Sequence, residues 1–148
     1  MTPFVTAGAG FLLAVLWFDL MFDVQVLRRQ EPSDEAVGSI AFYYRRVTTD
    51  ASPMNRLVGL VMLGTIAALV AQLAGDDAPS WVAASCLALT VGATGLAASR
   101  TFRRAARLGM RRDSPAEQAR LARLMLRDHL LCLAAIVSVL ALQLGFAR

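Results

Sequence analysis

The stretch LVGLVMLGTIAALVAQLAG at positions 57–75 contains no charged side chain, and it decides the class of fold. Three other uncharged runs resemble it, at positions 1–18, 78–99 and 130–147. Each run has about the 18 or more residues that a helix needs to cross roughly 30 Å of hydrocarbon. Because a chain in lipid must satisfy its own backbone hydrogen bonds, we expect these runs to be helices. The sequence therefore predicts an all-α, polytopic integral membrane four-helix bundle.

The composition agrees with a single membrane domain over residues 1–148. Apolar residues make up 57% of the chain and the mean hydropathy is +0.54, which places the chain outside the class of soluble domains. We expect the four spans at about residues 4–26, 55–74, 79–100 and 127–146.

All 15 basic residues are arginine, and they lie beside the uncharged runs rather than inside them. Arginines in such positions are typical of topology signals and of contacts with lipid headgroups. This distribution argues against nucleic acid as a partner, despite a pI near 10.0. The predicted partners are the lipid bilayer and anionic lipid headgroups.

The arginines also predict how the chain is oriented. Segments 27–56 and 100–127 hold fourteen of the 15 arginines, whereas the connection at 75–80 holds none. The positive-inside rule then places both arginine-rich loops in the cytoplasm, with both termini and the Asp76-Asp77 turn outside. We expect a multi-pass protein of the cell (plasma or inner) membrane.

Both arginine-rich loops contain helix signals. Within positions 33–47, five apolar side chains recur at helical spacing and predict an amphipathic helix at the cytoplasmic membrane surface: Val37, Ile40, Ala41, Tyr44 and Val47. In the second loop, Ser114-Pro115-Ala116-Glu117 is a capping-box pattern with proline at the first helical position. No breaker follows before Phe146, so we expect one long fourth helix.

Small residues recur along the third predicted span. Ala84, Ala88, Gly92 and Gly95 lie close to one helical face, and such positions permit close approach between helices. Gly59 and Ala67 could serve similarly in the second span. We expect this face to pack inside the bundle, with a contact between protomers as the alternative.

An acidic pair near the end of the first span is the most suggestive local feature. Asp19 and Asp23 are four residues apart, so both carboxylates project from one helical face among apolar neighbours. An ionised carboxylate at that depth costs a few kcal/mol unless it is paired or hydrated. The topology brings His129, the sole histidine, to a similar depth, and its unperturbed titration falls near neutral pH. Asp19, Asp23 and His129 are therefore the candidate catalytic residues.

The same topology brings further polar side chains to this depth. The candidate substrate-binding residues are Tyr43, Tyr44, Arg45, Asn55, Arg56, Arg100, Arg127 and Asp128. Two structural readings stay open: Asp23, Asp128 and His129 as ordinary interfacial residues, and Asp19 paired with Arg56 or Arg100. A divalent metal on Asp19, Asp23 and His129 is chemically conceivable, but no ligand spacing beyond the two acids supports it. We assign no metal and no cofactor.

The approach to the last span, Arg127-Asp128-His129 after an arginine-rich segment, resembles the small four-helix membrane proteins grouped with anthrone oxygenases. The likeness includes four spans and a longer first loop, and it covers about the second half of the chain. Two motifs depart from the family. Thr101-Phe102-Arg103-Arg104 replaces a Pro-x-Asn segment, and Leu130-Leu131-Cys132 stands where the family has an arginine. We transfer no catalytic role from this resemblance.

Three classes of function fit these features. The first is an enzyme or binder with a cytoplasmic-side polar pocket for a lipophilic substrate that enters from the bilayer. The alternative is an accessory or scaffold subunit of a larger membrane complex or homo-oligomer, which suits a small chain filled by its spans. The third is a proton- or cation-linked transporter, for which spans two to four carry few polar residues.

Overall fold

The computed structural model describes residues 1–27, 32–50, 52–75 and 77–147, and it is built from helices throughout these ranges. Four long helices form the bundle: α1 (Thr2–Asp23, extended by the 3-10 turn η1 at Val24–Val26), α3 (Ser52–Ala74), α4 (Ser80–Leu96) and α6 (Pro115–Phe146). Two shorter helices join them: α2 (Asp34–Arg45) with the π-helical turn η2 (Arg46–Asp50), and α5 (Phe102–Met110), which follows the π-helical turn η3 (Ala97–Thr101). The predicted all-α, four-span fold is confirmed.

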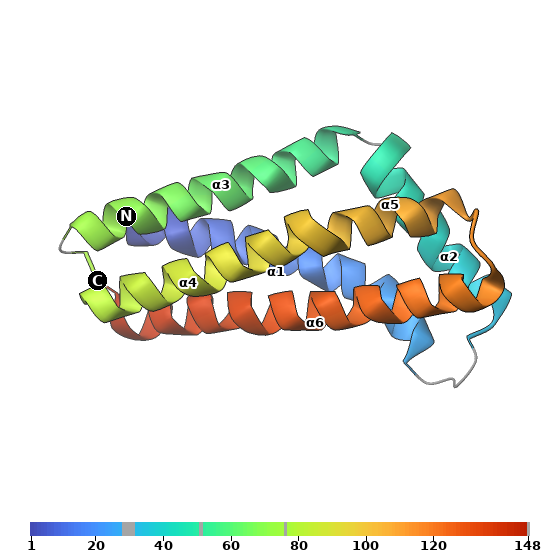
Figure 1. The fold of residues 1–148 in the computed structure, drawn as a ribbon. Helices are drawn as coiled ribbons and strands as arrows, with labels where there is room; N and C mark the ends of the chain where they lie inside the picture. The colour runs from blue at the N-terminus through green and yellow to red at the C-terminus, as the bar shows by residue number, and fades with distance from the viewer. Residues whose placement is uncertain (28–31, 51, 76, 148) are drawn as a thin grey trace.

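The four long helices lie side by side, and the chain ends meet at one end of the bundle (Figure 1). We call this the terminal end; it also holds the connection between α3 and α4. The opposite end, which we call the arginine-rich end, holds α2, α5 and the start of α6 (Figure 1). Helix α6 packs against α1 and α4, and α3 packs against the same two helices. Both termini share one end because the number of spans is even.

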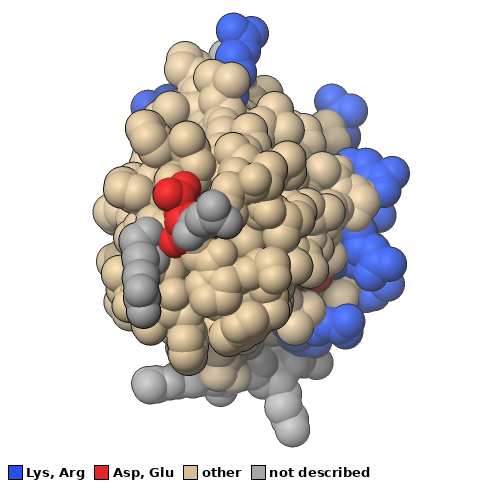
Figure 2. All heavy atoms as spheres, turned by 90° about the vertical axis from the view of Figure 1, so that its left-hand side faces the viewer, with Lys and Arg blue, Asp and Glu red and all other residues tan. Residues whose placement is uncertain are grey.

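The charged residues follow the same division. Viewed from the terminal end, the surface is almost entirely uncharged apart from an acidic group, and the basic side chains project only from its rim (Figure 2). The predicted topology signals Arg28, Arg29, Asp76 and Arg148 lie outside the described residues. The described arginines between positions 45 and 127 lie toward the other end, as a membrane-crossing bundle with basic loops requires.

The helices that are long and apolar enough to cross a membrane are Thr2–Val26, Pro53–Ala74, Ser80–Met110 and Pro115–Phe146. The third is longer than the predicted 79–100, because no glycine or proline occurs between Ala97 and Leu108. It ends where Arg111 adopts a left-handed conformation, with φ of 48°. The long fourth helix begins as predicted: the Ser114 hydroxyl accepts from the backbone N–H of Glu117, and Pro115 takes the first turn.

Two separate apolar cores hold the bundle together. The core of the terminal end consists of Val5, Ala9, Leu12, Leu69, Val82, Cys86, Ile136 and Val139. The core of the arginine-rich end consists of Leu20, Val26, Val37, Ile40, Ala41, Tyr44, Ala105, Leu108, Leu121, Ala122, Met125 and Leu126. The second core joins α2 and α5 to the end of α1 and to the first half of α6, so it closes the bundle at the arginine-rich end.

Helix α2 carries the predicted amphipathic stripe, but this stripe does not face lipid. Val37, Ile40, Ala41 and Tyr44 are buried, because α2 packs against α5. The contact is so close at Gly109 that an added Cβ would stand 2.9 Å from the backbone nitrogen of Arg45. Glycine at this position is what allows the two helices to approach.

The small-residue face of α4 departs from the prediction. Ala84, Ala88, Gly92 and Gly95 are exposed rather than packed inside the bundle. A Cβ added at Gly92 or Gly95 would meet nothing within 4 Å. The expectation that this face packs within the chain was therefore wrong, and a contact between chains stays a prediction.

Candidate functional site

The structure brings five of the predicted site residues into one cluster at the arginine-rich end. We call Asp19, Asp23, Tyr43, Tyr44 and His129 the carboxylate cluster. The Tyr44 hydroxyl donates to Asp23 Oδ1 over 2.8 Å, and His129 Nδ1 lies 2.6 Å from Asp23 Oδ2. Tyr44 Oη also lies 3.2 Å from His129 Nδ1, so the three side chains form a closed triangle. Asp23 is fully buried and paired, which offsets the cost of its burial.

Three helices position these side chains. Helix α1 presents Asp19 and Asp23 one turn apart on a single face, and α6 presents His129 opposite them. Helix α2 supplies both tyrosines, and the ring of Tyr43 stacks on Phe22 with centroids 4.1 Å apart. This stacking holds Tyr43 where its hydroxyl donates to Asp19 Oδ1 over 2.8 Å.

The two tyrosine hydroxyls act as donors in this cluster. Burial raises the pKa of Tyr43, and the neighbouring charge of Asp19 raises it further. Burial likewise raises the pKa of Tyr44, with Asp23 as the next cause. Both phenols therefore keep their protons at neutral pH and donate to the carboxylates.

Asp19 is less completely satisfied than Asp23. Its Oδ2 lies 3.8 Å from His129 Nε2, a distance at which charges attract but no hydrogen bond forms. Among the described residues, Tyr43 is the one hydrogen-bond donor to Asp19. The Asp19 side chain keeps 13% of its surface exposed, whereas Asp23 keeps none. One carboxylate is thus sealed into the protein and the other retains accessible acceptor capacity.

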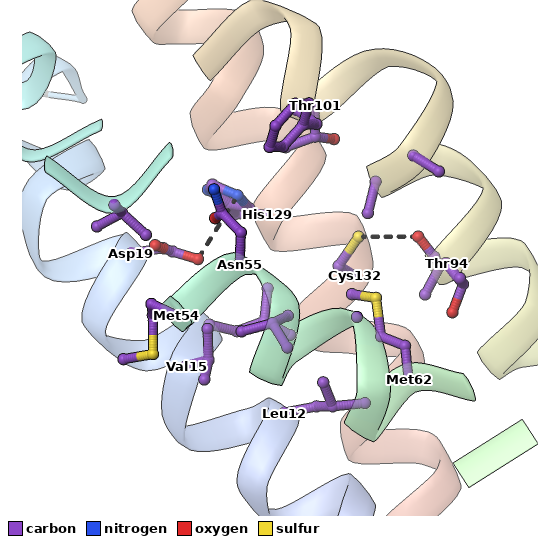
Figure 3. Close-up of a pocket in the computed structure, with 18 of the residues that line it drawn as sticks. Leu12, Val15, Asp19, Met54, Asn55, Met62, Thr94, Thr101, His129 and Cys132 are labelled. Atoms are coloured by element: carbon purple, nitrogen blue, oxygen red, sulfur yellow. Dashed lines mark hydrogen bonds and ion pairs between the residues drawn. The ribbon is translucent and has the colours of Figure 1, made fainter. Parts of the chain in front are cut away.

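That accessible carboxylate faces a cavity of about 790 Å³ bordered by α1, α3, α4 and α6. Asp19, Asn55 and His129 lie at one end of this cavity, and Leu12, Val15 and Met62 lie at the other (Figure 3). Toward the arginine-rich end, α3 diverges from α4 (Figure 1), and residues of both π-helical turns line the space between them. π-Helical turns occur frequently at functional sites.

The remaining predicted residues lie elsewhere or serve other contacts. Asn55 lines the cavity, and its side-chain amide donates to the Thr48 carbonyl over 2.8 Å. Arg45 is exposed and pairs with Asp50 over 3.8 Å. Three arginines predicted to face the carboxylates, Arg56, Arg100 and Arg127, are exposed and do not line the cavity. The prediction that Arg56 or Arg100 pairs with Asp19 was wrong, because Tyr43 and His129 occupy that side.

Asp128 was predicted for the same pocket but faces away from it. Its buried carboxylate forms an ion pair with Arg104 and lies 3.4 Å from the Thr101 hydroxyl. Because α4 continues through η3 into α5, it is Arg104 rather than Arg100 that faces α6. This pair therefore ties α5 to α6 outside the cavity.

Several lining residues were missed by the sequence analysis. Thr48, Met54, Thr101 and Cys132 line the cavity, and none stands in a recognisable motif. Within the described part of the chain, no group of three or more His, Cys, Asp or Glu side chains is arranged to hold a metal ion.

Comparison with known proteins adds one finding. A family model named SHR3 chaperone and described as "ER membrane protein SH3" matches residues 1–147. Among curated proteins and among solved structures, nothing matches significantly.

This match corrects three predictions. A chaperone family overturns the reading of the pocket as the site of an enzyme or binder for a lipophilic substrate, and it favours the accessory alternative. The resemblance to anthrone oxygenases holds only in pointing to a family of helical membrane proteins, and the family is a different one. A multi-pass membrane protein is supported, whereas the family description names the endoplasmic reticulum rather than the plasma or inner membrane.

Proposed function

We propose that this chain, which belongs to the SHR3 chaperone family of ER membrane proteins, acts as a chaperone inside the bilayer. Its client is another polytopic membrane protein, and its task is to hold a transmembrane segment of that client until the client's own helices have packed. The chain acts in the membrane into which the client is inserted. For the family, the description names the membrane of the endoplasmic reticulum.

The observation that carries this proposal is the cavity between the diverging helices. The cavity has a volume of about 790 Å³, and side chains of α1, α3, α4 and α6 line it. Association of helices in lipid depends on close packing and on interhelical hydrogen bonds, because lipid is as apolar as the helices themselves. A mostly apolar cavity with a polar end is therefore suited to contact a helix of another protein.

The rest of the chain supports a helper role within the membrane. Its four candidate spans take up most of the described residues, and the two short helices pack onto the ends of those spans. Within the described residues, the surfaces available to a client are therefore those of the spans and of the short helices α2 and α5. Both classes of surface suit a partner that is itself a membrane protein.

The proposal is tested by removing the chain from its native cell and measuring the membrane proteome. We expect a defined set of polytopic proteins to aggregate or to fall in abundance, and to recover when the wild-type chain is restored. Single-span membrane proteins serve as the internal control, because their one transmembrane helix has no second helix of the same chain to pack against. An unchanged set of polytopic proteins would refute a chaperone role.

A further inference from the structure

We propose that the cavity is the docking site for one transmembrane helix of the client, and that Asp19 recognises a cationic or hydrogen-bond-donating side chain on that helix. The inference rests on the proposed chaperone function and deepens it by naming the chemistry of the recognised segment.

The first support is the rim of the cavity. Four exposed large apolar side chains belong to its lining: Phe18 (60%), Met54 (45%), Leu63 (63%) and Phe102 (50%). They come from α1, α3 and α5, so apolar surface borders the cavity on several sides. A helix that approaches through lipid meets apolar surface at this rim and loses no polar contacts on entry.

The second support is the shape of the wall. Gly59 on α3 and Ala93 and Ala97 on α4 and η3 line the cavity, and a Cβ at Gly59 would meet nothing within 4 Å. Small side chains on facing walls let an incoming helix approach the backbone closely. These small side chains leave room between α3 and α4.

The third support is the charge at the polar end. The carboxylate cluster holds two carboxyl groups and one imidazole, so a single imidazolium can balance only one carboxylate. Asp23 takes the short contact with His129, which leaves Asp19, a lining residue of the cavity, with Tyr43 as its one hydrogen-bond donor among the described residues. Among the lining residues Asp19 is the sole carboxylate, and no arginine lines the cavity.

Charge complementarity then selects the occupant. An anionic lipid phosphate would be repelled by Asp19, and an uncharged acyl chain would leave the carboxylate without a second donor. A transmembrane helix with one lysine, arginine or amide side chain can place apolar side chains against the apolar lining and also supply that donor. Such polar residues are costly in lipid, so a client that carries one needs a temporary partner before its own helices assemble.

The test uses the full-length protein in lipid nanodiscs and synthetic transmembrane peptides of leucine and alanine. The three peptides differ only in the residue that lies at the depth of Asp19. This residue is lysine, leucine or glutamate. A photo-crosslinker at Met62, which lines the cavity, reports capture, and a crosslinker at the exposed Leu60 on the other side of α3 is the control. We expect the lysine peptide to be captured about tenfold more than the leucine peptide, a difference of about 1.4 kcal/mol. The glutamate peptide should be captured least.

Asp19→Asn should abolish the preference for lysine while the protein still folds, since asparagine can accept the Tyr43 hydrogen bond. Asp113→Asn makes the same chemical change at the same end of the bundle but outside the cavity, and should leave the preference intact. Thermal unfolding of both variants in detergent verifies that they fold.

The outcomes separate this inference from the proposed function. Equal capture of all three peptides, capture of lipid or of a second copy alone, or an unchanged preference in Asp19→Asn would overturn the inference. If one of these outcomes is found but polytopic proteins still depend on the chain in cells, the chaperone role stands and only the proposed docking site is wrong. If no protein depends on the chain, the chaperone role itself fails.

Discussion

Two buried polar sites stand at opposite ends of this bundle, and they differ in what they leave unsatisfied. At the terminal end, the side-chain amides of Gln72 and Gln143 exchange hydrogen bonds of 3.0 and 2.9 Å. Thr2 and Cys86 accept from the same amides, so this site is neutral and closed. At the arginine-rich end, the carboxylate cluster is ionisable and Asp19 faces a cavity.

This difference indicates that the terminal-end site stabilises the bundle, whereas the site at the arginine-rich end can bind a partner. A closed pair of amides stabilises the packing of its own helices and has nothing left to offer another chain. A carboxylate with one donor and open space before it retains free acceptor capacity. The comparison predicts that changes in the terminal-end pair affect stability alone, whereas changes at Asp19 affect recognition.

The largest effect on stability should come from His129→Leu. This change leaves Asp23 fully buried with Tyr44 as its remaining partner, and an uncompensated buried charge costs about 3–5 kcal/mol. The double variant Asp23→Leu, His129→Leu removes the charge as well and should recover much of that loss. Thermal unfolding in detergent measures both; a double variant less stable than the single one would show that the cluster is not coupled in this way.

The next effect should come from the close approach of α2 and α5. Gly109→Ala places a methyl group 2.9 Å from a backbone nitrogen that cannot move aside, and such overpacking costs about 1–3 kcal/mol. Gly92→Ala is the matched control, because its Cβ meets nothing within 4 Å. Chemical denaturation measures the stability of both variants. Equal stability would contradict the close packing of α2 on α5.

A smaller effect is expected at the terminal end. Gln143→Leu leaves the Gln72 amide without its reciprocal partner and should cost about 1–2 kcal/mol. Replacing both glutamines by leucine should recover most of this loss, since two apolar side chains need no hydrogen bonds in lipid. Peptide capture at the cavity should be unchanged in each variant. A change in capture would contradict the prediction that the terminal-end pair affects stability alone.

The smallest effect is expected on the exposed face of α4. Gly92→Leu should change stability by less than about 0.5 kcal/mol, because the new side chain enters open space. Capture at the cavity should also be unchanged, since Gly92 does not line it. A loss of self-association in crosslinking experiments would instead identify this face as a contact between chains.

Much of the carboxylate cluster could be predicted from the sequence. The spacing of Asp19 and Asp23 fixes a shared helical face, the topology places His129 at their depth, and the apolar stripe that contains Tyr44 predicts α2. These inferences depend on local periodicity and on the order of the spans, which sequence records directly.

The cavity and the partners of the arginines could not be predicted in this way. A cavity depends on how far α3 lies from α4, which is a long-range property with no local signal. The pairing of Asp128 with Arg104 instead of Arg100 depends on the uninterrupted helix through η3, whereas the sequence reading treated that segment as a loop. The spacing of the small residues of α4 predicts that they share one helical face. It does not show whether that face packs inside the bundle or lies on its surface.

Crosslinking in the native membrane reports directly whether the cavity receives a helix of a client protein. A photo-reactive residue is placed at Met62 in the cavity or at Leu60 on the exposed side of the same helix, and the captured molecules are identified by mass spectrometry. We predict that Met62 captures a transmembrane segment of a polytopic protein and that Leu60 captures lipid. If Met62 captures no protein segment, or if both positions capture protein equally, the cavity is not the docking site of a client helix.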